Sequence, residues 1–239
     1  MKLYDEVIAS WFSLLEKQSF RELEVDYEEK WPDEGKNNLV LPFEMAFELG
    51  GSRIPLVASG VTAVTSDKSL VDHDQILLYG KDLAEVKKET PYVRLAVCLV
   101  DDREIGEKDG LFNTIKAIEY VRYHVNPRGF MMRVSAAQKR ESVRVSTEAI
   151  ENGISFKNAG SLMIKAYRKN PKVKAVKLIF INEESFDFDA MQKEVRRCGD
   201  ITMAIDHIGN TPVMECNTCG LKKVCDEVEG MKELHFGNS

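Results

Sequence analysis

The feature that most constrains the fold is a change of hydrophobic pattern along the chain. Between residues 38 and 100, short apolar runs are separated by Gly, Pro and Asp, which is typical of β-strands. After residue 108, stretches with helical spacing alternate with further short apolar runs. Two consecutive strand–helix–strand units beside a strand-rich stretch predict an α+β protein with a mixed β-sheet and several packed helices.

The same patterns place the individual elements. We expect helices over residues 4–17, 110–123, 147–152, 158–168 and 187–197. We expect strands over residues 39–41, 45–47, 54–57, 61–64, 76–79, 93–100, 130–134, 142–146 and 173–181. Ser146 is the expected N-cap of the third helix, because its hydroxyl can accept from an amide that the first helical turn leaves unpaired. The charged stretch 20–37 is expected to be a connection or an exposed hairpin.

The chain of 239 residues is 44% hydrophobic, which is enough to build a core without disulfides. We expect an α+β domain over residues 1–209 and a cysteine-rich tail over residues 210–239. No run of about 18 apolar residues occurs, and the first residues are acidic rather than basic, so neither a membrane span nor a signal peptide is expected. The expected location is therefore a reducing cytoplasm, where clustered cysteines more often bind metals than form disulfides.

Three of the five cysteines lie in the last 24 residues, as Cys216-x-x-Cys219 and Cys225. A C-x-x-C turn lets two thiolates converge on one cation. A closed zinc site or a 4Fe-4S cluster needs four ligands, so His235, Cys198 or Cys98 would supply the fourth. Cys98 lies in an apolar run and is expected to be a buried core residue instead.

Two other interpretations of this segment stay open. The segment could bind nothing, or Cys216 and Cys219 could take part in thiol–disulfide exchange. The redox interpretation is the weaker one, because the pair does not open a helix after a strand, where such thiols gain their depressed pKa.

Charge is distributed unevenly along the sequence. Residues 122–177 contain thirteen basic and three acidic residues, a net charge of +10, whereas the whole chain carries −6. This basic segment is either a solvated surface or a site for a phosphate-bearing ligand, because arginine grips phosphate through paired donors. The candidate phosphate contacts are Arg128, Arg133, Lys139, Arg140 and Arg144. Nucleic acid is not expected as a partner, since the acidic remainder would repel its backbone and no nucleic-acid-binding signature occurs.

From Phe43 onward, several segments occur in an order found in one family. They are residues 47–55, residues 118–124, Gln138-Lys139, residues 144–146 with Gly153 after them, and residues 176–184. With the cysteines that follow, this order resembles the beta subunit of the carbon monoxide dehydrogenase/acetyl-CoA synthase complex. The resemblance implies a stand-alone, truncated relative of that family's middle domain, followed by the start of its cluster-binding region.

In that family the middle domain carries an arginine-rich face associated with coenzyme A, and the next domain binds an iron–sulfur cluster joined to nickel. By this resemblance Cys216, Cys219 and Cys225 correspond to the first three cluster cysteines, although the gap before Cys225 is shorter than the family's. His235 stands where the family has a fourth cysteine. The family holds its nickel through a Cys-Gly-Cys string, and no Cys-x-Cys occurs in this sequence, so nickel-centred carbon–carbon bond formation is not expected.

Three functions follow from these observations. The first is an accessory binding or electron-transfer protein of one-carbon or acetyl-CoA metabolism, with an iron–sulfur or zinc centre and a corrinoid or carbon monoxide dehydrogenase-type partner. The second is an enzyme subunit that binds coenzyme A or another phosphate-bearing small molecule on the basic segment. The third is an interaction module stapled by zinc. No catalytic residue is assigned, because the sequence has no G-x-S-x-G, P-loop or G-x-G-x-x-G string, and whether the chain is an enzyme stays open.

Overall fold

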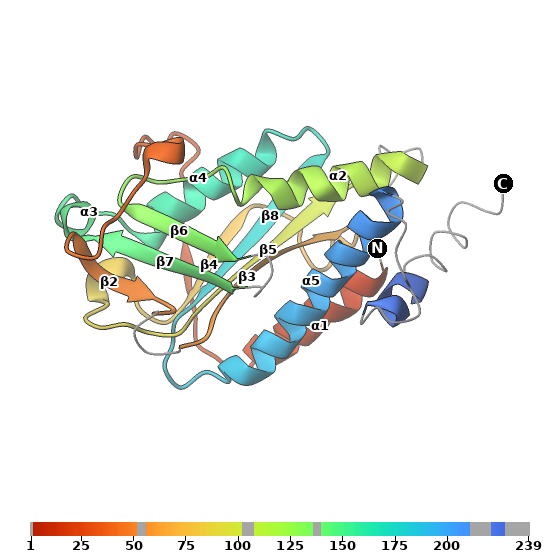
Figure 1. Ribbon diagram of the computed structural model, residues 1–239, viewed down its shortest axis with the longest axis horizontal. Helices are drawn as coiled ribbons and strands as arrows, with labels where there is room; N and C mark the ends of the chain where they lie inside the picture. The colour runs from red at the N-terminus through yellow and green to blue at the C-terminus, as the bar shows by residue number, and fades with distance from the viewer. Residues whose placement is uncertain (1, 52–55, 102–107, 136–139, 211–220, 228–239) are drawn as a thin grey trace.

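The described residues form two β-sheets flanked by helices (Figure 1). The structure is a computed structural model that describes residues 2–51, 56–101, 108–135, 140–210 and 221–227. The strands are β1 (Arg21–Leu23), β2 (Met45–Leu49), β3 (Ala58–Thr65), β4 (Gln75–Tyr79), β5 (Tyr92–Val100), β6 (Phe130–Ser135), β7 (Arg140–Ser146) and β8 (Val173–Ile181). The helices are α1 (Lys2–Leu15), α2 (Lys108–Val121), α3 (Thr147–Glu151), α4 (Phe156–Arg168) and α5 (Phe188–Asn210), with 3-10 turns η1 (Gly35–Asn37) and η2 (Leu83–Glu85).

The larger sheet has five strands in the order β1-β4-β8-β5-β3. The pairs β4–β8 and β3–β5 are parallel, whereas β1–β4 and β5–β8 are antiparallel. Strands β3, β5 and β8 are buried along nearly their whole length, which explains why their sequences read as continuous apolar runs rather than as alternating ones. The mixed sheet expected from the sequence is therefore confirmed.

The smaller sheet is antiparallel, in the order β2-β7-β6. Its register places Met131 opposite Arg144 and Ser135 opposite Arg140, so these residues share one face. Phe130, Val143 and Val145 occupy the other face and are fully buried toward the larger sheet. This alternation of polar and apolar residues lets the smaller sheet cover part of the larger sheet, where β7 contacts β3 and β5 (Figure 1).

Helices cover the remaining surfaces of the larger sheet. Helix α4 lies on β4 and β8 so closely that a Cβ added at Gly160 would come within 2.8 Å of Ile76. Helix α1 lies on the opposite face, where Asp5 accepts a hydrogen bond from Thr65 at 2.6 Å. Helix α5 packs against α1, β3 and α2, along the β3 edge of the sheet (Figure 1).

Most of the expected elements are confirmed, and the structure differs from the expected pattern or adds to it at four points. Residues 39–41 are not a strand: Leu39 and Leu41 are exposed, so their apolar side chains do not mark a buried strand. The strands divide into two sheets, because β7 pairs with β2 and β6 rather than with the central strands. Helix α5 continues past residue 197 to Asn210, since its buried face runs on through Ile201 and Ile205. Of the expected strand 54–57, only residues 56 and 57 are described, and they are not in a strand.

In the described part of the chain, no helix has the length and the apolar composition that crossing a membrane requires.

Candidate functional site

Cys225, the third cysteine of the segment, packs against the folded domain. Cys216, Cys219 and His235 lie outside the described residues. Cys225 lies on a short helix at residues 222–227, in which its amide donates to the Leu221 carbonyl at 2.9 Å. Val224 and Cys225 are half-buried and pack against the hydrophobic core. Among the described residues alone, no group of three or more His, Cys, Asp or Glu side chains is arranged to hold a metal ion.

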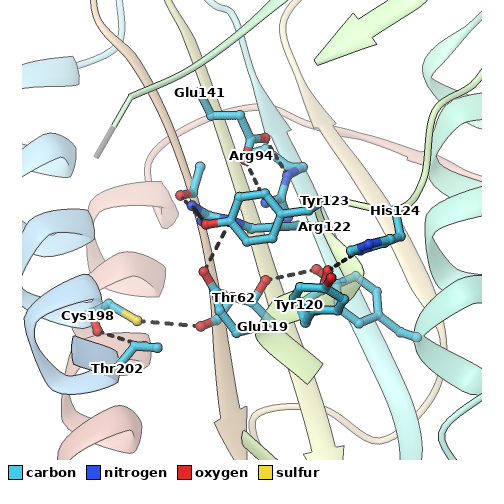
Figure 2. A network of polar contacts seen from close by, with 12 residues as sticks. Thr62, Arg94, Glu119, Tyr120, Arg122, Tyr123, His124, Glu141, Cys198 and Thr202 are labelled. Atoms are coloured by element: carbon cyan, nitrogen blue, oxygen red, sulfur yellow. Dashed lines mark hydrogen bonds and ion pairs between the residues drawn. The ribbon is translucent and has the colours of Figure 1, made fainter. Parts of the chain in front are cut away.

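Two further cysteines are in the interior. Cys98 is fully buried in β5, as expected, and burial raises the pKa of its thiol far above the ordinary value. Cys198, a predicted metal ligand, is fully buried in α5, and its Sγ lies 3.9 Å from the Thr62 carbonyl of β3 (Figure 2). The thiol of Cys198 is therefore directed into the core rather than to the surface.

Three of the five predicted phosphate contacts share the outer face of the smaller sheet. Arg133 and Arg144 converge on Glu48 of β2: Arg133 Nη1 lies 2.9 Å from Glu48 Oε1, and Arg144 Nε lies 3.5 Å from Glu48 Oε2. Glu48 is only 1% exposed and also accepts a hydrogen bond from Ser142. Arg140, at the other end of β7, donates to the carbonyls of Gly50, Gly51 and Leu56.

The local charge of this arginine face follows from these contacts. Three guanidinium groups and the carboxylate of Glu48 leave a net charge of +2. The side chain of Arg133 is 39% exposed, against 18% for Arg144. A phosphate that bound here would have to compete with Glu48 for Arg133 and Arg144, because both already pair with a buried carboxylate.

The other two predicted contacts are elsewhere. Lys139 lies outside the described residues. Arg128 precedes β6 and pairs with Glu148 at 2.9 Å and with Glu34 at 3.7 Å. The structure therefore groups Arg133, Arg140 and Arg144 and places Arg128 in a different, carboxylate-rich surrounding.

A buried ionic network lies between the two sheets (Figure 2). Arg94 of β5 contacts Glu141 of β7 through two hydrogen bonds, from Nε to Oε1 at 2.6 Å and from Nη2 to Oε2 at 2.9 Å. Arg122, just after α2, donates to the Gly60 carbonyl at 2.6 Å and pairs with Glu119 at 3.1 Å. The hydroxyls of Thr62 and Tyr167 are 2.8 Å apart in the same region. The members come from β3, β5, β7, α2 with the residue that follows it, and α4, so the network joins these five elements.

The pKa values of the two carboxylates in this network, Glu141 and Glu119, are shifted in opposite directions. Burial alone would raise the pKa of Glu141, but the charge and hydrogen bonds of Arg94, with help from Arg122, hold it below its ordinary value. Burial raises the pKa of Glu119, and the charges of Arg122 and Arg94 offset this only in part. Burial also raises the pKa of Tyr167 to about 12. Since Arg94 and Glu141 are at most 1% exposed, this network stabilises the sheet interface rather than contacting a ligand.

Sequence spacing does not identify the two acidic residues that pair with the arginines of the buried network and of the arginine face. Glu141 is one of only three acids in the basic segment 122–177, and Glu48 is distant in sequence from Arg133 and Arg144, which it contacts. The available signal for Glu48 is its position between Phe47 and Leu49, two residues of an apolar strand. A charged residue in such a strand indicates an internal partner.

The chain was compared with protein-family models and with curated proteins, and neither comparison found a match.

Proposed function

We propose that the chain is an accessory metal-binding protein, in which Cys216, Cys219 and Cys225 bind an iron–sulfur cluster or zinc. The observation that carries the proposal is the position of Cys225, which follows Cys219 by only six residues and is held on the surface of the domain by the packing of Val224 and of its own side chain. A thiol that is already positioned lowers the entropy that must be lost when the other ligands converge on a metal.

The role that fits such a centre is binding or electron transfer in one-carbon or acetyl-CoA metabolism, next to a corrinoid or carbon monoxide dehydrogenase-type partner. This assignment rests on the resemblance to the acetyl-CoA synthase beta subunit. The reaction at nickel is left out of the proposal, because the sequence has no Cys-x-Cys string to hold that metal in a square-planar site.

Metal and sulfide analysis of anaerobically purified protein tests the proposal. We expect either iron with sulfide and a visible charge-transfer band, or zinc without colour. Cys216→Ser, Cys219→Ser and Cys225→Ser should each lower the metal content severalfold, whereas Cys98→Ala, in the centre of β5, should not. Protein that contains neither metal, or a Cys225→Ser variant that keeps its full metal content, would contradict the proposal.

Further experiments on the anaerobically purified protein identify the role of the metal centre and its fourth ligand. His235→Ala and Cys198→Ala should differ in metal content, and the variant that loses metal names the ligand. If the metal is zinc and only staples an interaction module, its removal should leave the unfolding of the α+β domain unchanged. If the centre is redox-active, anaerobic titration with dithionite should bleach the visible band.

Coenzyme A binding is a second candidate function, favoured by the shared face of Arg133, Arg140 and Arg144. These residues would act as anion contacts and not as acid–base groups. Calorimetric titration with coenzyme A at low salt should show binding that Arg133→Gln weakens and that Arg196→Gln, on exposed α5 surface, does not. Absence of binding at low salt would remove this candidate.

A further inference from the structure

A groove of about 600 Å³ lies between the segment 31–44 and α3, on the side of the molecule where the smaller sheet ends. One wall consists of Trp31, Leu39 and Phe43, and the other is formed by α3 and the turn before β6. Its volume falls in the range of sites that take small ligands or single peptide side chains. Neither the cysteines nor the arginine face contributes to it, so the groove is a separate site.

Two of the three side chains of the apolar wall are exposed, and the loop that carries them is held at both ends by hydrogen bonds. Phe43 is 82% exposed and Leu39 61% exposed, which is unusual for large apolar side chains so close together. Asn38, next to Leu39, donates to the carbonyls of Pro127 and Phe130 and accepts from the Gly129 amide. At the other end of the loop, the Glu44 carbonyl accepts from the Thr147 amide at 2.9 Å. The loop that carries Leu39 and Phe43 is therefore held by hydrogen bonds at both of its ends.

Trp31 is fixed in the same way. Its indole Nε1 donates to the Arg128 carbonyl at 3.0 Å, and its amide donates to Glu29 at 2.8 Å. Walls that are ordered before a partner arrives lower the entropy cost of binding. The groove thus has the preorganisation of a docking site rather than that of a solvated loop.

The charge of the groove indicates the charge of the ligand that it would bind. Its lining contains four carboxylates, from Glu34, Glu44, Glu148 and Glu151, and the single cation Arg128, a net charge of −3. Arg128 is already paired with Glu148 and Glu34. An anionic ligand would be repelled here, whereas a cationic one would be attracted at long range and held by the remaining carboxylates.

We propose that this groove binds a basic segment of a partner protein, in which a large apolar side chain packs against Phe43, Leu39 and Trp31 while flanking lysines or arginines pair with Glu44 and Glu151. Both features are needed in one ligand, because exposed apolar side chains and carboxylates line the same open groove. A small cation would leave Phe43 and Leu39 exposed, and an apolar ligand would leave the carboxylates without a counter-charge.

Tryptophan fluorescence offers a direct test. The chain has two tryptophans, and Trp11 is fully buried in α1, so a ligand-dependent change in emission reports on Trp31. The probe is a short synthetic peptide with blocked ends that alternates lysine with leucine. We expect saturable binding to the full-length protein at low salt, with an affinity that falls as salt is raised. A peptide with glutamate in place of lysine should not bind.

Variants identify the groove as the binding site. Phe43→Ala should weaken peptide binding about tenfold, as expected for the loss of a central apolar anchor. Glu151→Gln should weaken it about twofold to threefold at low salt, whereas its matched control Glu16→Gln, in the exposed turn after α1, should have no effect. Phe43 is so exposed that its removal should not lower the Tm, which a melting curve checks.

Three outcomes would overturn the proposal. The first is an unchanged affinity in Phe43→Ala, or equal binding of the glutamate peptide. The second is binding of tetramethylammonium as tight as that of the peptide, which would make the groove a small-cation site. The third is self-association in sedimentation experiments that Phe43→Ala abolishes, which would make the occupant a second copy of this chain.

Discussion

Arg94 and Glu141 form a two-point ion pair that joins the two sheets, since Arg94 belongs to the larger sheet and Glu141 to the smaller one. A Cβ added at Gly60 would lie 2.1 Å from the Glu141 carboxylate, so the backbone of β3 forms the floor on which the pair rests. Arg122 binds the carbonyl of the same glycine. The contact between the sheets thus combines this ion pair with the apolar packing of Phe130, Val143 and Val145.

Removing one partner of this ion pair should lower the free energy of unfolding. Glu141→Gln keeps the shape of the side chain but leaves the buried charge of Arg94 without a counter-charge, which typically costs about 3–5 kcal/mol. Urea unfolding measures this cost. The double variant Arg94→Met with Glu141→Leu should recover much of it, because neither charge then remains buried. A loss below about 1 kcal/mol in Glu141→Gln would show that water or another group neutralises Arg94.

Glycine at position 60 should be required for the same pair. Gly60→Ala would force the new methyl group into the Glu141 carboxylate, and overpacking of this kind costs about 1–3 kcal/mol. In a Glu141→Ala background the same change should cost much less, because the colliding carboxylate is absent. A double-mutant cycle measured by chemical denaturation gives this coupling, and additive effects would contradict the prediction.

The two buried glutamates should respond oppositely to pH. The pKa of Glu141 is lower in the folded protein than its ordinary value of about 4.5, so its contribution to stability is present above that pH and is lost as pH falls through the folded pKa. The difference in unfolding free energy between the wild type and Glu141→Gln should therefore shrink between pH 6 and pH 3.

The pKa of Glu119 is raised in the folded protein, so the folded state binds more protons than the unfolded chain above pH 4.5, and stability falls as pH rises through that interval. Glu119→Gln removes this effect. The free energy of unfolding of this variant, relative to that of the wild type, should therefore be higher at pH 7 than at pH 4. Urea unfolding across this pH range checks both variants. Parallel pH profiles for Glu119→Gln and Glu141→Gln would contradict the assignment of opposite shifts.

The N-cap of α3 should contribute measurably to stability. The Ser146 hydroxyl accepts a hydrogen bond from the Ala149 amide at 3.1 Å, which satisfies one of the amides that the first helical turn leaves unpaired. Ser146→Ala should cost about 1 kcal/mol. Ser10→Ala, on α1, is the matched control and should change the unfolding free energy by less than about 0.5 kcal/mol. Equal effects at the two serines would show that the cap is not what stabilises α3.

The interior thiols should be protected from alkylation. Cys98 and Cys198 are fully buried, and burial raises the pKa of Cys98, so little thiolate is available to react. Iodoacetamide at pH 8 followed by peptide mass spectrometry should find both residues unmodified in the folded protein and modified in urea. Rapid alkylation of Cys198 in the native state would show that the β3 side of α5 opens.

Local sequence patterns predict most of the helices and strands of this protein, because each element carries its own periodicity and caps. The serine at position 146 is an example, since its capping role depends only on the next three residues. The misplaced strand at 39–41 shows the limit. Its apolar residues indicate burial, but Leu39 and Leu41 are exposed on a loop that Asn38 and Glu44 hold. Apolar side chains of a surface loop and of a strand look alike in sequence.

The candidate sites depend on contacts between distant residues, and these cannot be predicted from spacing. The arginines at 133 and 144 form a basic cluster in sequence, whereas the structure neutralises part of that charge with Glu48 from another strand. The groove is formed by two segments about a hundred residues apart. The metal site proposed for the cysteines is the opposite case, because its expected ligands Cys216, Cys219 and Cys225 are close in sequence and can be named without the fold.

The position of β8 has a consequence for synthesis of the protein on the ribosome. Among the described residues, strand β8 is the last strand in sequence and yet lies between β4 and β5, so it connects the β1–β4 pair to the β5–β3 pair. Until residues 173–181 are synthesised, β4 and β5 lack their common neighbour, and the backbone amides and carbonyls that later pair with β8 have no strand partner on that side. Such long-range pairing slows folding and lengthens exposure to aggregation. A nascent chain of this protein therefore needs its own residues 173–181, or a chaperone acting in their place, before the larger sheet exists as one unit.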